Sequence, residues 1–367
     1  MSQPHILITG GAGYIGSHTA KAVARAGLVP VVFDNLSNGH RDAVLWGPFV
    51  HGDVRDKDAL HAAMVRHRIS GVIHFAGRIE VGASAQAPDI FWDHNLNGVA
   101  ATLAAMRAAG VRRIVFSSTA AVYGQPASAA PLRESDPTLP INPYGDTKLA
   151  GERLIAASCA AYGLEGVALR YFNASGADPE GRIGEAHGDE SHLIPLAIEA
   201  ALGLREGLTL HGVDFPTPDG TCVRDYVHVD DLASAHLLAL RAPLPSNAPF
   251  LAANLGAGRG YSVREIILAV TEVVGCAPPV TEGPRRAGDP AVLIADIAKA
   301  AEVLGWRPRT SSLGTIIETA VAWRRSPAFG FVANDRAGTD RVDVGDAAPV
   351  LVDQHGAAPD LNRRAVG

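Results

Sequence analysis

The chain has 367 residues, of which 47% are hydrophobic and 19% charged, so it can bury a large core and we expect a globular protein with two lobes. Its formal charge of −6 and its scattered basic residues exclude an electrostatic footprint for nucleic acid or an anionic membrane. The three cysteines match neither a disulfide framework nor a zinc motif, no signal peptide precedes the first strand-like run, and no apolar stretch approaches the ~20 residues that span a bilayer. These features predict a cytoplasmic protein without nucleic-acid or membrane partners.

A dinucleotide site is predicted near the N-terminus. A buried-strand run at residues 5–9 leads into Gly10, Gly13 and Gly16 and then into a helical stretch. This order lets a pyrophosphate approach the backbone N–H groups at the start of the helix. A second strand ends in Asp34, whose carboxylate would accept hydrogen bonds from a ribose 2′-hydroxyl and repel a 2′-phosphate. The pattern predicts NAD rather than NADP, and an ordinary glycine-rich turn is the alternative.

Alternating strands and helices continue along the chain and predict an α/β fold with a doubly wound parallel sheet of the Rossmann type. Further strands are expected at 49–51, 71–75, 112–116 and 167–170, and helices at 56–67, 88–109 and 144–162. Ligands of such sheets lie beyond the carboxyl ends of the strands, which places Asp53, Phe75, Ala76 and Gly77 beside adenine and ribose. For Asp53, a turn-forming role after a strand is the alternative.

Tyr144 and Lys148 stand four residues apart at the start of a predicted helix, so their side chains share one face. A cation about 4 Å from a phenol can lower its pKa by about three units, and the resulting tyrosinate can act as a base beside a nicotinamide. By itself the spacing also fits a surface contact. Ser117 and Thr119 follow the strand at 112–116, and a hydroxyl there can bridge a substrate oxygen and the phenolate or simply form a turn.

Together these motifs resemble the extended short-chain dehydrogenase/reductase family and, within it, the 4-epimerases of UDP-hexoses. The resemblance covers about residues 5 to 325. It is carried by the glycine run from Gly10 and by residues 74–77, 117–124, 144–148, 170–173, 224–229 and 254–258. It implies NAD-dependent interconversion of UDP-glucose and UDP-galactose by transient oxidation at C4. It also implies a homodimer built on helices 88–109 and 144–162.

The resemblance assigns a role to individual residues. Tyr144 is implied as the base, Lys148 as its cation and nicotinamide-ribose anchor, and Thr119 as the bridging hydroxyl. The cofactor set is Gly10, Gly13, Tyr14, Ile15, Gly16, Asp34, Asn35, Asp53, Val54, Phe75, Ala76, Gly77, Asn95, Ser117, Tyr144, Lys148, Tyr171 and Phe172. The UDP-sugar set is Thr119, Tyr144, Asn173, His192, Leu193, Arg224, Arg286, Asp289 and Leu293. No metal is expected, and His187 and His192 are interpreted as solvated loop histidines.

Departures from the family pattern favour one type of reaction but leave the identity of the sugar substrate open. Ala120 and Ala121 stand where related dehydratases place an acid and a base, so hydride transfer without elimination is expected. Ile79 replaces a lysine of many relatives, and Leu293 replaces a tyrosine that bounds the sugar pocket. The alternatives are a 4-epimerase for another UDP-sugar, such as an N-acetylhexosamine or a pentose, and a non-catalytic NAD-sensing scaffold.

Three regions are expected. Residues 1–175 form the NAD-binding Rossmann domain. Residues 176–326 form mainly a smaller α/β lobe for the UDP-sugar, with segments that return to the first domain. Residues 327–367 form a poorly ordered tail, because their composition is low in aromatic residues.

Overall fold

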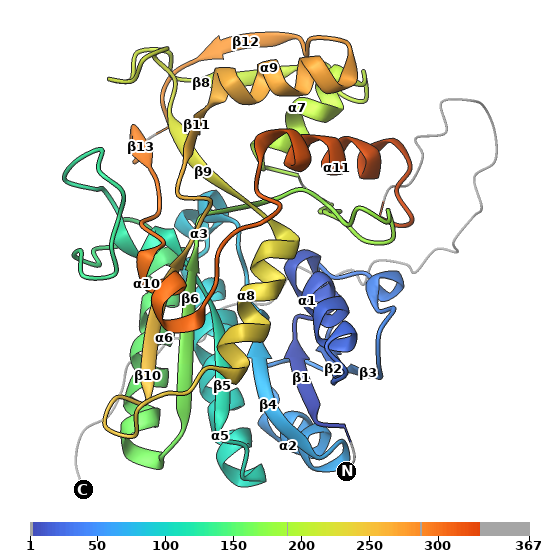
Figure 1. The fold of residues 1–367 in the computed structure, drawn as a ribbon, viewed down its shortest axis with the longest axis vertical. Coiled ribbons are helices and arrows are strands. Elements are labelled where there is room, and N and C mark those ends of the chain that lie inside the picture. Colours follow the sequence, from blue (N-terminus) through green and yellow to red (C-terminus); the bar gives the residue numbers. More distant parts are fainter. Residues whose placement is uncertain (1–2, 189, 287, 331–367) are drawn as a thin grey trace, which may run out of the picture. The chain divides into compact units, whose positions relative to one another are not determined.

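The computed structural model describes residues 3–330 except Asp189 and Ala287, so the predicted tail lies outside the described residues from Phe331 onward. Its main sheet has seven strands (Figure 1). These are β1 (His5–Thr9), β2 (Val29–Asp34), β3 (Phe49–His51), β4 (Ile69–His74), β5 (Arg113–Thr119), β6 (Glu165–Tyr171) and β10 (Phe250–Leu255). The order is β10-β6-β5-β4-β1-β2-β3, with every neighbouring pair parallel. The predicted fold class is confirmed. The order reverses between β1 and β4, which is where such sheets bind ligands.

Helices cover both faces of this sheet. α1 (Tyr14–Arg25), α8 (Val229–Arg241) and α10 (Ala298–Leu304) share one core with the sheet, and α2 (Lys57–Arg66), α5 (Gly98–Ala109) and α6 (Pro143–Tyr162) share the other. In β1, Ile6 and Ile8 face the first core and Leu7 faces the second. Because both faces are buried, the strands are continuous apolar runs rather than alternating ones.

The helix predicted over residues 88–109 is interrupted. It consists of α4 (Pro88–Phe91), a π-helical turn η2 (Trp92–Asn97) and α5, and α3 (Val81–Gln86) precedes it. The π-helical turn carries Asn95, which is buried. Such turns occur often at functional sites, since the wider turn redirects a side chain.

A second group of elements lies beyond the carboxyl ends of the main strands (Figure 1). It contains β7 (Asn173–Ser175), α7 (Leu193–Ala201), β8 (Leu208–His211), β9 (Val223–His228), β11 (Gly260–Ser262), α9 (Val263–Val274), β12 (Val280–Gly283), β13 (Val292–Leu293) and α11 (Leu313–Arg325). The described residues also contain two short 3-10 turns, η1 (Arg41–Ala43) and η3 (Ala120–Tyr123). α7, α9 and α11 share a third core. β10, α8 and α10 return to the main sheet from the range 176–326, and the domain boundaries themselves stay a prediction.

Asp225 on β9 joins three separate parts of the chain. Its fully buried carboxylate accepts backbone N–H groups from Ala257 at 2.6 Å, Gly258 at 3.0 Å and Ala295 at 3.1 Å. Gly256 is pressed against it, since a Cβ there would lie 2.4 Å from Asp225 Oδ2. The loop after β10 and the segment after β13 are therefore both anchored to β9.

We predict that Asp225→Ala lowers the free energy of unfolding by about 3–5 kcal/mol, because three buried N–H groups lose their acceptor. Urea denaturation followed by circular dichroism measures this. The control is Asp58→Ala on the surface of α2, which should cost less than about 1 kcal/mol. Equal effects of the two substitutions would contradict the anchoring role.

Candidate functional site

The glycine turn between β1 and α1 is tightly packed. Gly10 has a φ of +70°, and a Cβ there would lie 2.6 Å from the backbone nitrogen of Ala76, which follows β4. A Cβ on Gly16 would lie 2.2 Å from the carbonyl oxygen of Gly10. Gly13 is the N-cap of α1 and supplies no capping side chain, so the first N–H groups at Tyr14 and Ile15 have no side-chain acceptor at the cap. The turn thus has the form that a pyrophosphate cradle requires.

Asp34 lies at the end of β2 beside this turn. Its carboxylate accepts the N–H of Ala12 at 3.0 Å and that of Leu36 at 2.8 Å. Burial raises the pKa of Asp34, although these two hydrogen bonds oppose the shift. The residue predicted to select the ribose therefore also holds the glycine turn in place.

Asn35 and Asp53 are joined to each other at the carboxyl ends of β2 and β3. Asn35 Nδ2 donates to Asp53 Oδ2 at 3.2 Å, and Arg55 forms an ion pair with the same carboxylate at 2.7 Å. Hydrogen bonds from Arg55 hold the pKa of Asp53 well below its usual range. Val54 is buried against Gly98. The structure thus brings these predicted adenine-side residues together, and it places an arginine among them that the sequence did not single out.

Asn95 links the loop after β4 to α6. Its side chain accepts the N–H of Arg78 at 2.7 Å and donates to the Arg78 carbonyl at 3.1 Å and to Thr147 Oγ1 at 2.9 Å. A Cβ on Gly77 would lie 2.7 Å from Asn95 Oδ1. The ring of Phe75 packs against His236, with the ring centroids 4.6 Å apart. The loop that carries Phe75, Ala76 and Gly77 is therefore held from both sides.

The residues predicted to be catalytic converge where β5 meets α6. Asn142 caps α6 by accepting the N–H of Gly145 at 2.8 Å, which places Tyr144 and Lys148 in the first two turns. Lys148 Nζ donates to the carbonyl oxygen of Ser117 at 3.0 Å and lies 5.9 Å from the centroid of the Tyr144 ring. The Thr119 hydroxyl is close enough to the Tyr144 phenol to lower its pKa. The structure thus brings these three residues together, and their catalytic roles stay a prediction.

The electrostatics of this pair differ from the prediction. Burial raises the pKa of Tyr144 to about 12, against a lowering by the Thr119 hydrogen bond. Burial also lowers the pKa of Lys148 to about 8. The expectation that Lys148 lowers the pKa of Tyr144 enough to give a tyrosinate is wrong for the nucleotide-free protein, because burial of the phenol is the larger effect and the Lys148 ammonium is itself desolvated.

A buried polar network lies directly behind the pair, and sequence reasoning missed it. Arg170 forms a two-point ion pair with Glu152 of α6, at 2.9 and 2.6 Å. Glu152 also accepts the hydroxyl of Ser118, and Arg170 donates to Tyr123 Oη at 3.1 Å. Tyr123 in turn donates to Asn254 at 2.6 Å. The network joins β5, α6, β6 and β10, and the only sequence signal for it was membership in the motifs at 117–124, 170–173 and 254–258.

Two aromatic residues lie at the carboxyl end of β6: Tyr171 is its last residue, and Phe172 follows it. Tyr171 shares a hydrogen bond with the hydroxyl of Ser117, and burial raises its pKa well above the usual value. Phe172 packs in a small core with Ala120, Leu149 and Leu293. Tyr171 thus lies beside Ser117, whose carbonyl holds Lys148, and the cofactor role of both aromatic residues stays a prediction.

The predicted diphosphate and uridine residues form one charged cluster at β9 and β13. Arg224 donates to the carbonyls of Val223 and Pro290 and lies 3.7 Å from Asp289. Arg286 is more exposed and lies 3.3 Å from the same carboxylate. Leu293 pairs in register with Arg224. The structure therefore brings these four residues together.

The remaining substrate-side residues occupy two places. Asn173 of β7 donates to the Asp225 carbonyl at 3.0 Å, and Leu193 begins α7. His192 is the N-cap of α7 but makes no side-chain cap; its Nδ1 lies 2.6 Å from Glu185 Oε1. His187 is only 18% exposed in its side chain and lies 3.3 Å from the same oxygen. The interpretation of His187 as a solvated loop histidine is wrong, because it is largely buried and lies beside a buried carboxylate. His192 is half exposed, with 51% of its side chain accessible, but it is also paired with Glu185.

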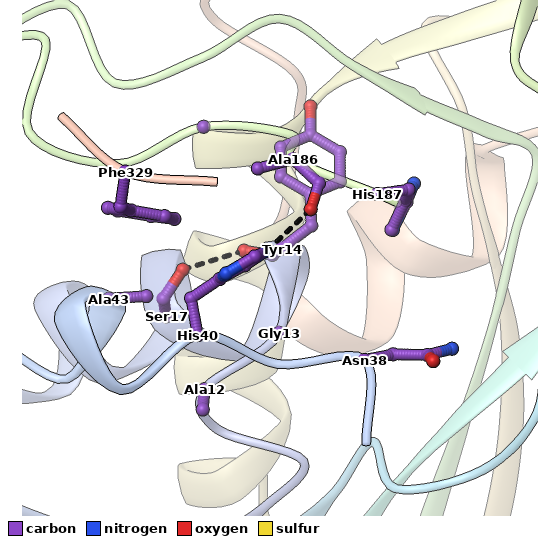
Figure 2. A pocket seen from close by; sticks show the side chains of 11 residues that line it. Ala12, Gly13, Tyr14, Ser17, Asn38, His40, Ala43, Ala186, His187 and Phe329 are labelled. Atoms are coloured by element: carbon purple, nitrogen blue, oxygen red, sulfur yellow. Dashed lines mark hydrogen bonds between the residues drawn. The ribbon is translucent and has the colours of Figure 1, made fainter. Parts of the chain in front are cut away.

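A cavity of about 10 Å³ lies beside the glycine turn (Figure 2). Its lining includes Ala12, Gly13 and Tyr14 from the turn and Ala186 and His187 from the loop before α7 (Figure 2). The Tyr14 hydroxyl donates to the Gly176 carbonyl at 2.5 Å. The loop before α7 is thus in contact with the predicted cofactor turn. Within the described part of the chain, no helix is both long and apolar enough to cross a membrane.

Comparison with known proteins identifies relatives over nearly the whole described chain. A family model described as "NAD dependent epimerase/dehydratase family" matches residues 6–252. The UDP-glucose 4-epimerase of Halalkalibacterium halodurans is 47% identical over 331 residues, 90% of this chain and 98% of that protein. The crystal structure of UDP-glucose 4-epimerase from Brucella ovis in complex with NAD superposes with a TM-score of 0.84 at 49% identity, covering 87% of this chain and 97% of that one. The structure of the UDP-Glc/GlcNAc 4-epimerase of Campylobacter jejuni superposes with a TM-score of 0.76 at 37% sequence identity, covering 88% of this chain and 99% of that one.

We predict that Lys148→Met makes the nucleotide-free protein more stable at pH 7. The lowered pKa means that the charged lysine costs about 3 kcal/mol in the folded state at this pH. The lost hydrogen bond to Ser117 offsets part of this, which leaves a gain of about 1–2 kcal/mol. The cost is fully present below pH 8 and disappears as the pH rises toward the unfolded value near 10.5. Chemical denaturation at pH 7 and pH 9.5 measures the difference, and a variant that is less stable at both values would contradict the desolvation.

Proposed function

The chain belongs to the NAD dependent epimerase/dehydratase family, and we propose that within it the protein interconverts UDP-glucose and UDP-galactose with tightly bound NAD. The observation that carries this is the Tyr144–Lys148–Thr119 group beside a glycine turn that ends in Asp34. Relatives that carry the name UDP-glucose 4-epimerase support the same activity.

The residues of the turn fit NAD. The missing side chains at Gly10 and Gly16 leave the backbone open, and the Asp34 carboxylate can accept ribose hydroxyls while it repels a 2′-phosphate. In this proposal the nicotinamide side of the site is bordered by Lys148, Asn95, Ser117, Tyr171 and Phe172. When bound, NAD supplies a hydride acceptor for the sugar C4 and a positive charge beside the Tyr144 phenol.

Tyr144 takes the proton from the sugar 4-hydroxyl and returns it after the sugar has turned over. Thr119 holds the phenol oxygen in line with that hydroxyl, and Lys148 is held by the Ser117 carbonyl where it can bind a ribose. In the protein alone the phenol is protonated, since its pKa is about 12. Ionisation of the Tyr144 phenol therefore requires bound substrate and NAD, so Tyr144 does not act as a base before both are present.

The uridine diphosphate is held by the charged cluster around Arg224. Arg224 and Arg286 are both directed at Asp289, so an arriving diphosphate meets two guanidinium groups already collected in one place. Asn173 and Leu193 complete this site, and Asp289 accepts from the uridine ribose. With the diphosphate fixed, the 4-keto sugar can turn about its linkage and present its other face.

Alanines at positions 120 and 121 favour epimerisation over elimination. Both lie in η3 directly after Thr119, where the loss of water would require an acid and a base. We also propose a homodimer through the helices at 88–109 and 143–162, where Ile90 and Trp92 are exposed apolar residues, and a cytoplasmic location.

We predict that the purified protein converts UDP-galactose to UDP-glucose without added NAD. Tyr144→Phe should lower kcat at least about 100-fold and leave the NAD content unchanged, because only the proton-transfer oxygen is lost. The matched control is Tyr162→Phe at the exposed end of the same helix, which should retain activity. Without product from the parent protein the proposed function is wrong, and near-normal turnover by Tyr144→Phe would reject only the base.

A second prediction concerns N-acetylated substrates and depends on Leu293. This side chain packs beside Ala120 and Phe172, next to the Tyr144 site. We expect UDP-glucose and UDP-galactose as best substrates and weaker turnover of UDP-N-acetylgalactosamine. Leu293→Tyr should remove the weaker activity, changing the kcat/KM ratio by roughly 10 to 200-fold, because the added ring fills the space beside C2. Leu293→Met, of similar volume, is the control. A ratio that both substitutions leave unchanged would show that Leu293 does not border the sugar.

A further inference from the structure

Four potential metal ligands from one short segment converge just before α7. The ligand atoms of Glu185, His187, Glu190 and His192 all lie within 4.8 Å of one another. Glu185 Oε1 is 3.3 Å from His187 Nδ1 and 2.6 Å from His192 Nδ1. Glu190 approaches the same imidazoles, at 3.7 Å from His187 Nδ1 and 3.4 Å from His192 Nδ1. Each of the two carboxylates thus faces both imidazoles.

One ligand atom of this group is buried without a hydrogen-bond partner. The Glu190 side chain is only 6% exposed; its Oε1 accepts the N–H groups of Ser191 and His192 at 2.8 Å, but Oε2 has no such partner. Oε2 is directed at the cluster, where His187 Nδ1 is 3.7 Å away. A buried carboxylate oxygen usually has a donor or a cation, so this atom indicates a missing ligand.

The backbone of the segment is held independently of the four side chains. Trp323 Nε1 donates to the Glu185 carbonyl at 2.9 Å, and His40 Nε2 contacts the Ala186 carbonyl at 2.6 Å (Figure 2). The indole of Trp323 also packs over Gly184, where a Cβ would lie 2.5 Å from the ring. The backbone at residues 184–186, which carries Glu185, is therefore braced by other parts of the fold.

We propose that Glu185, His187, Glu190 and His192 bind one divalent transition-metal ion, with Zn²⁺ as the preferred metal. Two imidazole nitrogens and two carboxylate oxygens suit Zn²⁺ better than Mg²⁺ or Ca²⁺, which prefer oxygen ligands alone. Tetrahedral coordination at 2.0–2.2 Å needs ligand separations of about 3.3–3.6 Å. Glu185 Oε1 and Glu190 Oε2 lie 3.3 and 3.7 Å from His187 Nδ1, and all four ligand atoms lie within 4.8 Å of one another. The contact of 2.6 Å between Glu185 and His192 must lengthen, and the longest separations must shorten, for tetrahedral coordination.

The charges around the cluster permit a dication. Two buried carboxylates need two positive charges, and one divalent ion supplies the same charge as two protonated imidazoles. Arg324 also faces these carboxylates, and its guanidinium is engaged by Glu199. A cluster of protonated histidines without metal is the competing state, and the experiment below separates the two.

Such a site is structural rather than catalytic, because all four positions are filled by the protein. His187 lines the same small cavity as Tyr14 of the glycine turn (Figure 2), and His192 directly precedes Leu193. A bound ion thus fixes the loop between the proposed NAD turn and the helix that begins the UDP site. His192 then acts through the metal and not by touching the sugar nucleotide.

The test is metal binding by the full chain after dialysis against a chelator. We expect one equivalent of Zn²⁺ by calorimetry and metal analysis, and a visible absorption band of four-coordinate Co²⁺ when cobalt is added. His187→Gln with His192→Gln should weaken binding by more than about 100-fold, since changes in outer-shell partners alone cost 10–100-fold. His61→Gln on α2, outside the cluster, is the matched control and should bind as the parent does.

The outcomes are distinct from those of the epimerase assay, because metal content and the cobalt spectrum do not depend on turnover. The site is supported if the double variant loses the bound equivalent of Zn²⁺ while the parent protein and His61→Gln retain it. Absence of binding by the parent protein overturns it, and so does equal binding by parent and double variant. A circular dichroism spectrum of the double variant identifies misfolding, and in that case the cobalt spectrum of the parent decides: a four-coordinate band supports the site, and a six-coordinate spectrum overturns it.

Discussion

The buried ion pair between Arg170 and Glu152 is the interaction on which the proposed active site depends. Both side chains are nearly inaccessible, and their further hydrogen bonds reach Ser118 of β5 and Tyr123 of η3. A buried pair is tolerated only when it is fully hydrogen-bonded, and removing one partner leaves an uncompensated charge. Because Glu152 lies one helical turn beyond Lys148, the pair sets the rotation of α6 and thereby aims Tyr144 and Lys148 at the end of β5.

Desolvation dominates the electrostatics of that site. It raises the pKa of Tyr144 and lowers that of Lys148, so neither group has its working charge more readily than in water. Desolvation therefore destabilises the charged forms of both groups in the folded state, and in the proposed mechanism the phenol ionises only when NAD and substrate are bound. Strain of this kind is common where function and stability compete.

The glycine turn and the segment at 184–192 lie next to each other in the fold, although about 170 residues separate them in the sequence. Gly10 allows the backbone of the turn to approach Ala76, Gly16 allows α1 to approach the Gly10 carbonyl, and the Tyr14 hydroxyl reaches the Gly176 carbonyl. His187 and Tyr14 both line the small cavity beside the turn. Order in the loop before α7 is therefore coupled to the cofactor turn by direct contact, whether protons or a metal ion neutralise Glu185 and Glu190.

The sequence by itself determined the parallel α/β class, the positions of six of the seven strands of the main sheet, the glycine turn with Asp34 and the Tyr144–Lys148 spacing, because these are local patterns with a period of their own. Only the tertiary structure decided the π-helical turn at Asn95, the pairing of Arg55 with Asp53, the network behind α6 and the pairing of His187 and His192 with buried carboxylates. It also decided the pKa of Tyr144, which spacing alone predicted in the wrong direction. Burial and the approach of residues distant in sequence control these features, and neither can be read from spacing along one helix.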